Sequence, residues 1–259
     1  MTERKTIEDF YAQLASAYDT FTEWEKRWTR EQHFFQSLIN LYNITSAIDA
    51  GCGTGFHSLL LSHLGVNVVA ADLSKEMLHI TERNAKKYCT PLTIVQSSFQ
   101  ELSQNIPQPV DAVFCLGNSF PHCLSKKEQQ RAIQNFFSVL KPNGVLILQL
   151  LNYERILQQH ARIQNVKQIG EKTFVRFYDF LNSTIRFNIL TLEERNKEMY
   201  HTLSSVELYP MRKKEIIQML ADASFAAKKC FCDIQCFGSV ALEEYQEMTS
   251  KDLVVLAKK

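Results

Sequence analysis

Hydrophobic and polar positions follow two different patterns along the chain, and the pattern changes near residue 152. Before that point, short apolar runs alternate with longer amphipathic stretches. The apolar runs predict strands at SAIDAG, VNVVAAD, LTIVQS, VDAVFCL and GVLILQLL. Strands that alternate with amphipathic helices are typical of a parallel sheet with helices on both faces. Ser74 is expected to cap the helix over 75–88, and Ser125 with Glu128 forms a capping-box pattern before 126–140.

Beyond Asn152 the sequence has the texture of an antiparallel sheet. Strands are predicted over 172–180, 184–194 and 198–210, joined by turn-like segments at 182–183 and 195–197. A helix over 212–225 and strands over 227–237 and 252–259 then close the main sheet. We therefore predict an α/β, Rossmann-like core formed by 1–151 and 211–259, with an N-terminal helical segment over 1–45. Residues 152–210 are predicted to form an inserted antiparallel β lid.

Composition and charge narrow the functional classes. The 259 residues are 45% hydrophobic and 22% charged, and 29 Lys and Arg stand against 28 Asp and Glu, which favours a globular domain. No basic run is present, so nucleic acid is not an expected partner. No apolar stretch approaches the ~18 residues of a membrane span, and the charged N-terminus favours a cytoplasmic protein.

The seven cysteines are an odd number, and most of them stand singly, which favours reduced thiols. Cys230, Cys232 and Cys236 form a C-x-C-x3-C cluster. That spacing lacks the paired C-x2-C arms usual for zinc, and alternation along a strand explains Cys230 and Cys232 on one face. No metal site is predicted.

Three glycines, Gly51, Gly53 and Gly55, lie between the first strand and the next helix. Glycines there let the backbone turn sharply and approach a ligand at the carboxyl edge of the sheet. A dinucleotide-binding fingerprint requires glycine at position 56, where this chain has Phe56. Asp72 ends the second strand, where a carboxylate can bind both hydroxyls of a ribose. The alternative is a tight turn with Asp72 capping the next helix.

This constellation resembles the glycine motif and acidic partner of class I S-adenosylmethionine-dependent methyltransferases. The resemblance implies S-adenosyl-L-methionine as cofactor and S-adenosyl-L-homocysteine as product. Ser98 would then lie near the adenine amino group, and Phe99 would pack on the ring or belong to the core. The implied cofactor-binding residues of the sheet edge are Asp49, Ala50, Gly51, Gly53, Gly55, Asp72, Leu73, Ser98, Phe99, Leu116 and Gly117.

The segment VFCLGNSFPHC, residues 113–123, resembles the corresponding strand end of glycine and sarcosine N-methyltransferases. The likeness continues through LKPNGVLILQLLNYERIL and the LYP at 208–210, and it spans roughly residues 10 to 225. It implies that Asn118 and His122 are catalytic and acceptor-binding residues. Tyr153, Arg176 and Tyr209 are the further acceptor-binding residues that we infer.

One position departs from this family. An arginine that binds the carboxylate of the amino acid in the glycine enzymes is replaced by Leu151, and leucine cannot provide bidentate carboxylate recognition. Glycine is therefore not the expected acceptor. Either Arg176 or Arg186 reaches in from the lid, or the acceptor is less acidic; on alternating strands, arginines also occupy the solvated face.

The N-terminal segment also takes part by this resemblance. Tyr11, Tyr18 and Arg30 are expected to touch the methionine end of the cofactor, with a hydrophobic face packed on the core as the alternative. Transfer of a methyl group from a sulfonium requires alignment and a lone pair on the acceptor, and no protein nucleophile. If the amine arrives protonated, His122, Tyr18 or Tyr153 could take the proton.

Other activities fit the 113–123 segment less well. Base-modifying nucleic-acid methyltransferases carry two prolines after the asparagine, which this chain lacks, so base flipping is disfavoured. A Cys/His nucleophile pair lacks an orienting third group, and His122 has a structural role as its alternative. We therefore predict a methyltransferase acting on a small-molecule amine, without nucleic acid or membrane partners. A homo-oligomer is the assembly that we consider. A protein or RNA methyltransferase and a non-catalytic cofactor-binding protein remain the alternatives.

Overall fold

The computed structural model describes residues 7, 9–11, 24–222 and 230–259. Its helices are α2 (Trp24–Tyr42), α3 (Phe56–His63), α4 (Lys75–Lys87), η1 (Phe99–Glu101), α5 (Leu102–Asn105), η2 (Phe120–His122), α6 (Lys126–Val139), α7 (Tyr153–Gln159) and α8 (Lys213–Ala221). Its strands are β1 (Ser46–Ala50), β2 (Asn67–Asp72), β3 (Thr93–Gln96), β4 (Val110–Cys115), β5 (Leu140–Leu151), β6 (Ile163–Ile169), β7 (Lys172–Phe180), β8 (Ile185–Arg195), β9 (Glu198–Leu208), β10 (Cys232–Phe237) and β11 (Asp252–Lys258).

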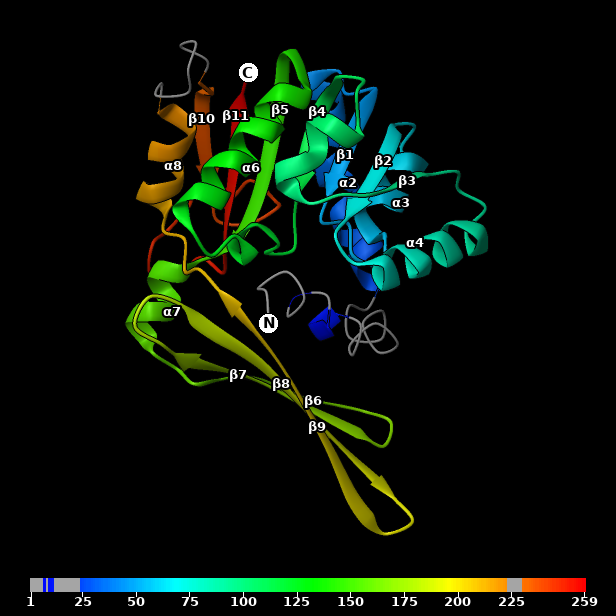
Figure 1. The fold of residues 1–259 in the computed structure, drawn as a ribbon, viewed down its shortest axis with the longest axis vertical. Helices are drawn as coiled ribbons and strands as arrows, with labels where there is room; N and C mark the ends of the chain where they lie inside the picture. The colour runs from blue at the N-terminus through cyan, green and yellow to red at the C-terminus, as the bar shows by residue number, and fades with distance from the viewer. Residues whose placement is uncertain (1–6, 8, 12–23, 223–229) are drawn as a thin grey trace.

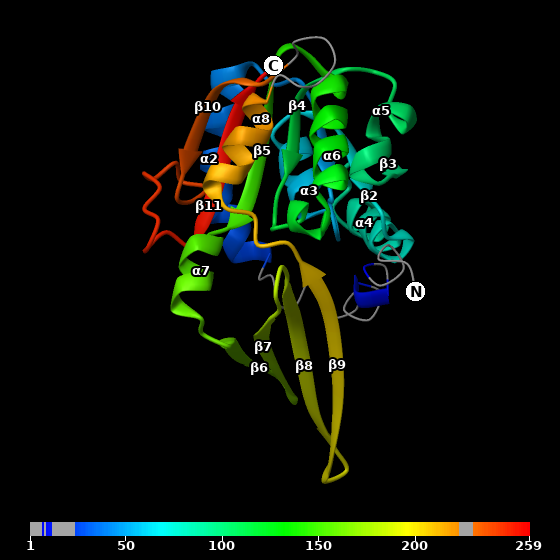
Figure 2. The same cartoon turned by 60° about the vertical axis from the view of Figure 1, so that its left-hand side comes forward.

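The main body is built around one seven-stranded sheet in the order β10-β11-β5-β4-β1-β2-β3 (Figure 1). Strands β1 to β5 pair in parallel, whereas β11 runs antiparallel to β5 and β10 antiparallel to β11. The predicted α/β fold is therefore confirmed, and the last two strands close the main sheet as expected. Figure 2 shows the second sheet projecting from the body at the end opposite the C-terminus.

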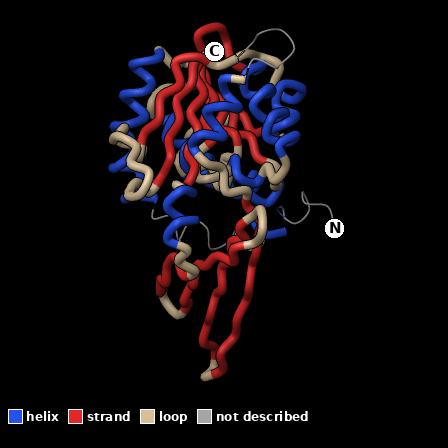
Figure 3. The backbone as a smooth tube through the Cα atoms, turned by 90° about the vertical axis from the view of Figure 1, so that its left-hand side faces the viewer, coloured by secondary structure: helices blue, strands red, loops and turns tan. Residues whose placement is uncertain are grey.

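Helices cover both faces of the main sheet, as the tube in Figure 3 shows. Successive side chains of β4 point to opposite faces, as the pleat requires. Val113 packs in the core that contains Phe136 of α6. Phe114, on the opposite face, meets Phe35 of α2 with ring centroids 5.8 Å apart. A strand buried on both faces in this way is apolar along its whole length, which explains the continuous hydrophobic runs of the sequence.

Both predicted helix caps are present. Ser74 accepts a hydrogen bond from the Met77 N–H at the start of α4. At the start of α6, Ser125 Oγ accepts from the Glu128 N–H, and the Glu128 carboxylate accepts from the Ser125 N–H at 3.0 Å. These caps satisfy backbone donors that have no partner inside the helix.

The second sheet has the antiparallel order β6-β7-β8-β9, within the predicted lid segment 152–210. Two elements of this segment, helix α7 and strand β6, were missing from the prediction. Strand β6 is exposed along most of its length, so its sequence lacks the alternation that identifies a half-buried strand. The two-domain division at 151/152 and 210/211 stays a prediction.

The inner part of the second sheet packs against the body. Phe10 forms a small core with Phe174 and Ile189, and Tyr153 of α7 packs with Tyr178. The far end of the hairpin is exposed. None of the helices in the described part of the chain is long and apolar enough to cross a bilayer.

Asn152 connects three segments where the main sheet meets α7. Its side chain is fully buried, and its amide nitrogen donates to the carbonyls of Glu247 and Ser250 at 2.8 and 2.9 Å. Its amide oxygen accepts from the Arg155 N–H and from the Tyr245 hydroxyl. Asn152 therefore joins the end of β5, the first turn of α7 and the loop before β11.

Replacing Asn152 by alanine leaves several buried polar groups without partners. We expect the Asn152→Ala variant to lose about 2 kcal/mol or more of unfolding free energy, because each unsatisfied buried group costs about 1–3 kcal/mol. Urea denaturation checks this. Asn182→Ala, in the exposed turn between β7 and β8, is the matched control and is expected to change the same free energy by less than about 0.5 kcal/mol. Equal losses in the two variants would contradict the role of Asn152.

Candidate functional site

The turn between β1 and α3 forms the floor of the site. The N–H groups of Gly51 and Cys52 both donate to the Ala71 carbonyl of β2, at 2.8 and 3.0 Å. Gly51 has a φ of +76°, and a Cβ atom there would lie 2.9 Å from the Cβ of Ser119 and 3.2 Å from the Phe99 ring. Only glycine therefore fits this close approach of the turn to the neighbouring segments.

Asp72 lies directly beside this turn. Its two carboxylate oxygens accept from the backbone N–H groups of Gly53 at 2.8 Å and Ser74 at 2.9 Å. Burial raises the pKa of Asp72 to about 6, against the opposing effect of these hydrogen bonds. The carboxylate is thus held in one orientation at the end of β2, where Asp72 lines the adjoining cavity.

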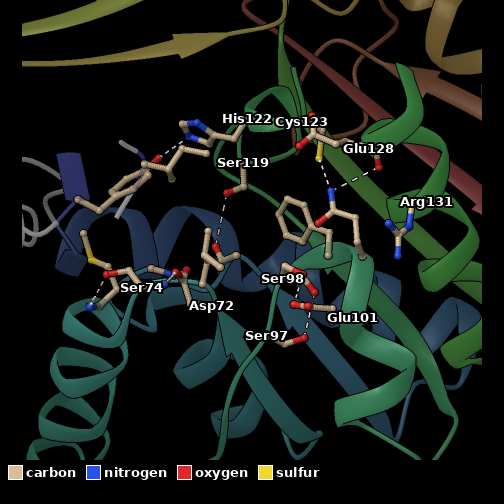
Figure 4. A pocket seen from close by; sticks show the side chains of 18 of the residues that line it. Asp72, Ser74, Ser97, Ser98, Glu101, Ser119, His122, Cys123, Glu128 and Arg131 are labelled. Atoms are coloured by element: carbon tan, nitrogen blue, oxygen red, sulfur yellow. Dashed lines mark hydrogen bonds between the residues drawn. The ribbon is translucent and has the colours of Figure 1, made fainter. Parts of the chain in front are cut away.

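A cavity of about 460 Å³ adjoins the glycine turn. Figure 4 shows it in close-up, with Asp72, Ser98, Ser119 and His122 among the side chains around it. Of the residues predicted to bind the cofactor, seven line it: Tyr11, Gly51, Gly53, Asp72, Leu73, Ser98 and Phe99. The Phe99 ring also meets the Phe136 ring of the core, with centroids 5.5 Å apart, so it is at once a wall and a core residue.

The turn after β4 is locked onto β5. The Asn118 N–H donates to the Gln149 carbonyl at 3.1 Å, and its side-chain oxygen accepts from the Leu151 N–H at 2.9 Å. Its amide nitrogen donates to the Tyr153 hydroxyl at 2.9 Å. Asn118 and the preceding Gly117 have positive φ values of 65°, which asparagine and glycine tolerate best.

His122 and Tyr11 lie between two cavities, because both residues line both of them. The Tyr11 hydroxyl and His122 Nε2 are 2.8 Å apart and share a hydrogen bond. Burial lowers the pKa of His122 to about 4, so the imidazole is neutral near pH 7. Within the described part of the chain, its buried Nδ1 has no hydrogen-bond partner.

The cysteines around this turn are unsuited to nucleophilic chemistry. Cys115 and Cys123 are buried free thiols. Burial raises the pKa of Cys123 to about 12 and that of Cys115 well above its ordinary value, so both stay protonated. Among the described residues, no three His, Cys, Asp or Glu side chains come together as a possible metal site.

The second cavity, of about 370 Å³, lies on the lid side of Tyr11 and His122. Of the predicted residues, it is lined by Tyr11, Arg30, Gly117, Asn118, His122 and Arg176. Arg176 projects from β7, and aromatic side chains of the same lid sheet, Tyr178 and Phe187, line the cavity beside it. The other lid arginine, Arg186, pairs with Glu207 at 3.3 Å instead.

A buried ion network from α2 forms another wall of this cavity. Arg27 donates to both oxygens of Glu31 at 2.9 and 3.1 Å, and His57 Nε2 lies 3.3 Å from the same carboxylate. Burial alone would raise the pKa of Glu31, but His57 and Arg27 hold it well below its ordinary value. Arg30 also binds Glu31, at 3.0 Å. The network fixes these side chains at the cavity wall.

Several predicted site residues line neither cavity. Asp49 is buried beneath the glycine turn, where the Ser58 hydroxyl donates to it at 2.6 Å and burial raises its pKa. Tyr153 is also fully buried, while the Tyr209 hydroxyl donates to Glu215 at 2.8 Å in a different hollow of the surface. Ala50, Gly55 and Leu116 lie in the turns and strands behind the cavity walls. Tyr18 lies outside the described residues.

Other residues of the second cavity were absent from the sequence prediction. Gln149 and Asp252 come from adjacent strands, and Arg27 and Glu31 come from α2. An i, i+4 pair of opposite charges, as in Arg27 and Glu31, is visible in the sequence but usually lies on a solvated helix face. Nothing in the sequence around Asp252 distinguishes it from an ordinary strand end.

Comparisons with known proteins agree with this geometry. Residues 47–144 match the family model described as "Methyltransferase domain". The glycine/sarcosine N-methyltransferase of Parasynechococcus marenigrum (strain WH8102) is 36% identical over 165 residues, which cover 64% of this chain and 57% of that protein. The glycine/sarcosine N-methyltransferase of Aphanothece halophytica is 29% identical over 219 residues, which cover 84% of this chain and 80% of that protein. The first alignment thus spans little more than half of that relative's length.

A solved structure, an S-adenosylmethionine-dependent methyltransferase from Clostridium acetobutylicum ATCC 824, shares the fold over 96% of this chain and 98% of its own. The TM-score is 0.78 and the sequence identity 17%. Sheet order, glycine turn and acidic strand end define a Rossmann-like methyltransferase fold. Residues 47–144 thus resemble a methyltransferase domain, and the chain shares the Rossmann-like fold of a solved S-adenosylmethionine-dependent methyltransferase.

Gly51 tests the close packing of the floor. A left-handed φ costs any non-glycine residue roughly 1–2 kcal/mol, and a Cβ at position 51 additionally collides with Ser119. We expect Gly51→Ala to lose more unfolding free energy than Gly170→Ala, whose φ is also positive at +59° but whose surroundings are open. Parallel urea titrations measure the difference, and similar losses would show that the turn is not tightly packed.

Proposed function

We propose that the protein transfers a methyl group from S-adenosyl-L-methionine to the nitrogen of a small-molecule amine, releasing S-adenosyl-L-homocysteine. The observation that carries the proposal is that two cavities meet at Tyr11 and His122. One is bounded by the glycine turn and Asp72, and the other by the β4 turn and the lid. The relatives named glycine/sarcosine N-methyltransferases support an amine nitrogen as the methylated atom.

The first cavity suits the cofactor chemically. Asp72 is positioned to accept from ribose hydroxyls, and Phe99 and Ser98 provide an apolar surface and a polar group for the adenine. Gly51 and Gly53 both line this cavity, and nothing lies within 4 Å of the position of a Cβ at Gly53, so the backbone of the turn is open to a ligand there. When bound, the cofactor supplies the sulfonium methyl group. Tyr11 and Arg30 are the groups that we assign to its methionine end.

The second cavity is assigned to the acceptor. Asn118 holds the β4 turn rigid through its bonds to β5, and His122 and Arg176 provide polar groups on two sides of the space. Alignment of two bound reactants can contribute several kcal/mol, up to about 7–11 in well-oriented model systems. The main contribution of the protein is therefore to orient the reactants and exclude water.

If the amine binds as an ammonium ion, a base must remove its proton before methyl transfer. The buried groups nearby are poor bases. His122 is neutral but weakly basic, with its pKa near 4, and Tyr153 is protonated because burial raises its pKa far above the ordinary value. Tyr18 stays a prediction. The acceptor's identity, the proposed cytoplasmic location and a homo-oligomeric state likewise stay predictions, as does the absence of nucleic acid and membrane partners.

Cofactor affinity is expected to depend on pH through Asp72. Because its pKa is about 6, lowering the pH from 7.5 to 5 converts most of it to the neutral form, and affinity should fall about tenfold if only the carboxylate binds ribose well. Folding stability of the cofactor-free protein depends on pH in the opposite direction. The folded pKa exceeds the ordinary 3.8, so the contribution of Asp72 to stability decreases as pH rises from about 4 to 6.

Calorimetric titration with S-adenosyl-L-homocysteine across this pH range checks the expectation. Asp72→Asn should bind weakly at every pH and lose the pH dependence near 6. The control Asp233→Asn, which changes an exposed carboxylate of β10, should behave as the unmodified protein. A pH profile shared by all three proteins would assign the effect to another group.

Methyl transfer itself is tested with methyl-labelled S-adenosyl-L-methionine and a cell extract separated by molecular size. We expect label in the small-molecule fraction, and loss of that label in Asp72→Ala. Label only in protein or RNA would establish a macromolecular acceptor instead. Cofactor binding without any labelled product would favour the non-catalytic alternative.

A further inference from the structure

Asp252 stands at the beginning of β11 and lines the second cavity. It pairs across the strands with Leu151, so Gln149 is its diagonal neighbour on the same face of the sheet. The Gln149 side-chain amide donates to the Asp252 carboxylate at 3.3 Å, and its oxygen accepts from the Gly117 N–H at 3.2 Å. Gln149 therefore connects Asp252 to the turn that follows β4.

The negative charge of Asp252 is poorly compensated. Its side-chain donor is the neutral amide of Gln149, and within residues 24–222 and 230–259 no Lys or Arg forms an ion pair with it. Arg27 and Arg30, which border the same cavity, are engaged by Glu31. Asp252 is partly buried, and a partly buried carboxylate that forms no ion pair is stabilised by the arrival of a cation.

On balance, the surroundings of Asp252 disfavour its ionised form. Burial raises the pKa of Asp252, and the hydrogen bond from Gln149 and the charge of Arg155 oppose it only in part. Glu31 raises the pKa further, whereas Lys251 lowers it. The ionised form is thus less stable than in water, as expected for a site that is completed by a positively charged ligand.

His122 is a second polar side chain of the cavity wall with an incomplete set of hydrogen bonds. His122 borders the same space, and its buried Nδ1 has no hydrogen-bond partner among the described residues. In the tautomer that donates from Nε2 to Tyr11, Nδ1 is an acceptor. An ammonium group carries three N–H donors, whereas a hydroxyl group carries one donor.

On the basis of the proposed function, we propose that the Asp252 carboxylate is the ammonium-binding group of the acceptor site, so that the acceptor is an alkylamine that enters protonated. The ammonium group then passes one proton to this carboxylate, which frees the nitrogen lone pair; the new C–N bond forms as the C–S bond of the sulfonium breaks, and Asp252 releases the proton to water. Three arginines also line this cavity, and Arg27 and Arg30 are bound to Glu31; next to Asp252 itself stands the uncharged Gln149. Alcohols and phenols of similar shape would not gain from this carboxylate.

The test compares ethanolamine with ethylene glycol, in which a hydroxyl replaces the ammonium group. Ligand-observed NMR titrations use the full chain in the presence of S-adenosyl-L-homocysteine. The unmodified protein should prefer ethanolamine, and Asp252→Asn should reduce that preference roughly 10- to 100-fold, the worth of a hydrogen bond between charged groups. Asparagine is isosteric and still accepts from Gln149. Because the preference is a ratio within one protein, partial misfolding does not alter it.

Asp233→Asn is the matched control, since it removes an exposed carboxylate that pairs with Lys258 at 3.2 Å. An unchanged preference in Asp252→Asn, or no preference for ethanolamine in the unmodified protein, would overturn the inference. Methyl transfer to a small molecule together with an unchanged preference would leave the proposed function intact. A preference that depends on Asp252 without any methyl transfer would support the ammonium site and count against the proposed function.

Discussion

The parallel pairing of β1 with β2 and β4 is the constraint on which the rest of the molecule depends. It brings three strand ends to one edge of the sheet, and the turns that follow them interlock. The backbone of Gly51 donates to β2, and the Asp72 carboxylate accepts from the Gly53 N–H. These hydrogen bonds hold the Asp72 carboxylate beside the glycine turn, although Gly53 and Asp72 are 19 residues apart in the sequence.

The neighbouring strands extend the same arrangement toward the lid. Asn118 is bonded to β5 and to Tyr153, and Asn152 ties the end of β5 to the loop that precedes β11. This side of the second cavity is therefore held by amide groups with several partners each, which orient their neighbours without adding charge. Such satisfied buried networks favour one rigid geometry, which is what alignment of two reactants requires.

Several reactive side chains beside the cavities are uncharged near neutral pH. The buried thiols of Cys115 and Cys123 stay protonated, and His122 is uncharged near pH 7. Charged side chains line both cavities: Asp72, Glu101, Lys127, Glu128 and Arg131 in the first, and Glu31, Asp252 and three arginines in the second. This distribution suits a reaction in which the protein binds and orients groups and forms no covalent bond with them.

Local pattern and glycine spacing were enough to predict the α/β sheet, both helix caps and the Asp72 position, because each depends on residues close together in sequence. Strand β6 and helix α7 escaped prediction, since an exposed edge strand lacks alternation and a seven-residue helix depends on its packing against the lid. Asp49 and Tyr153 were predicted to face ligands, yet the fold turns both into the interior.

The sequence by itself determined the class of fold and the cofactor half of the site, because a strand, a glycine turn and an acidic strand end specify that geometry over short distances. The second cavity, in contrast, depends on the tertiary structure. Gln149, Asp252 and Glu31 come from two strands and a helix, and they meet only because β11 inserts beside β5 and α2 packs across the sheet. No local pattern records such a meeting, since it depends on long-range packing.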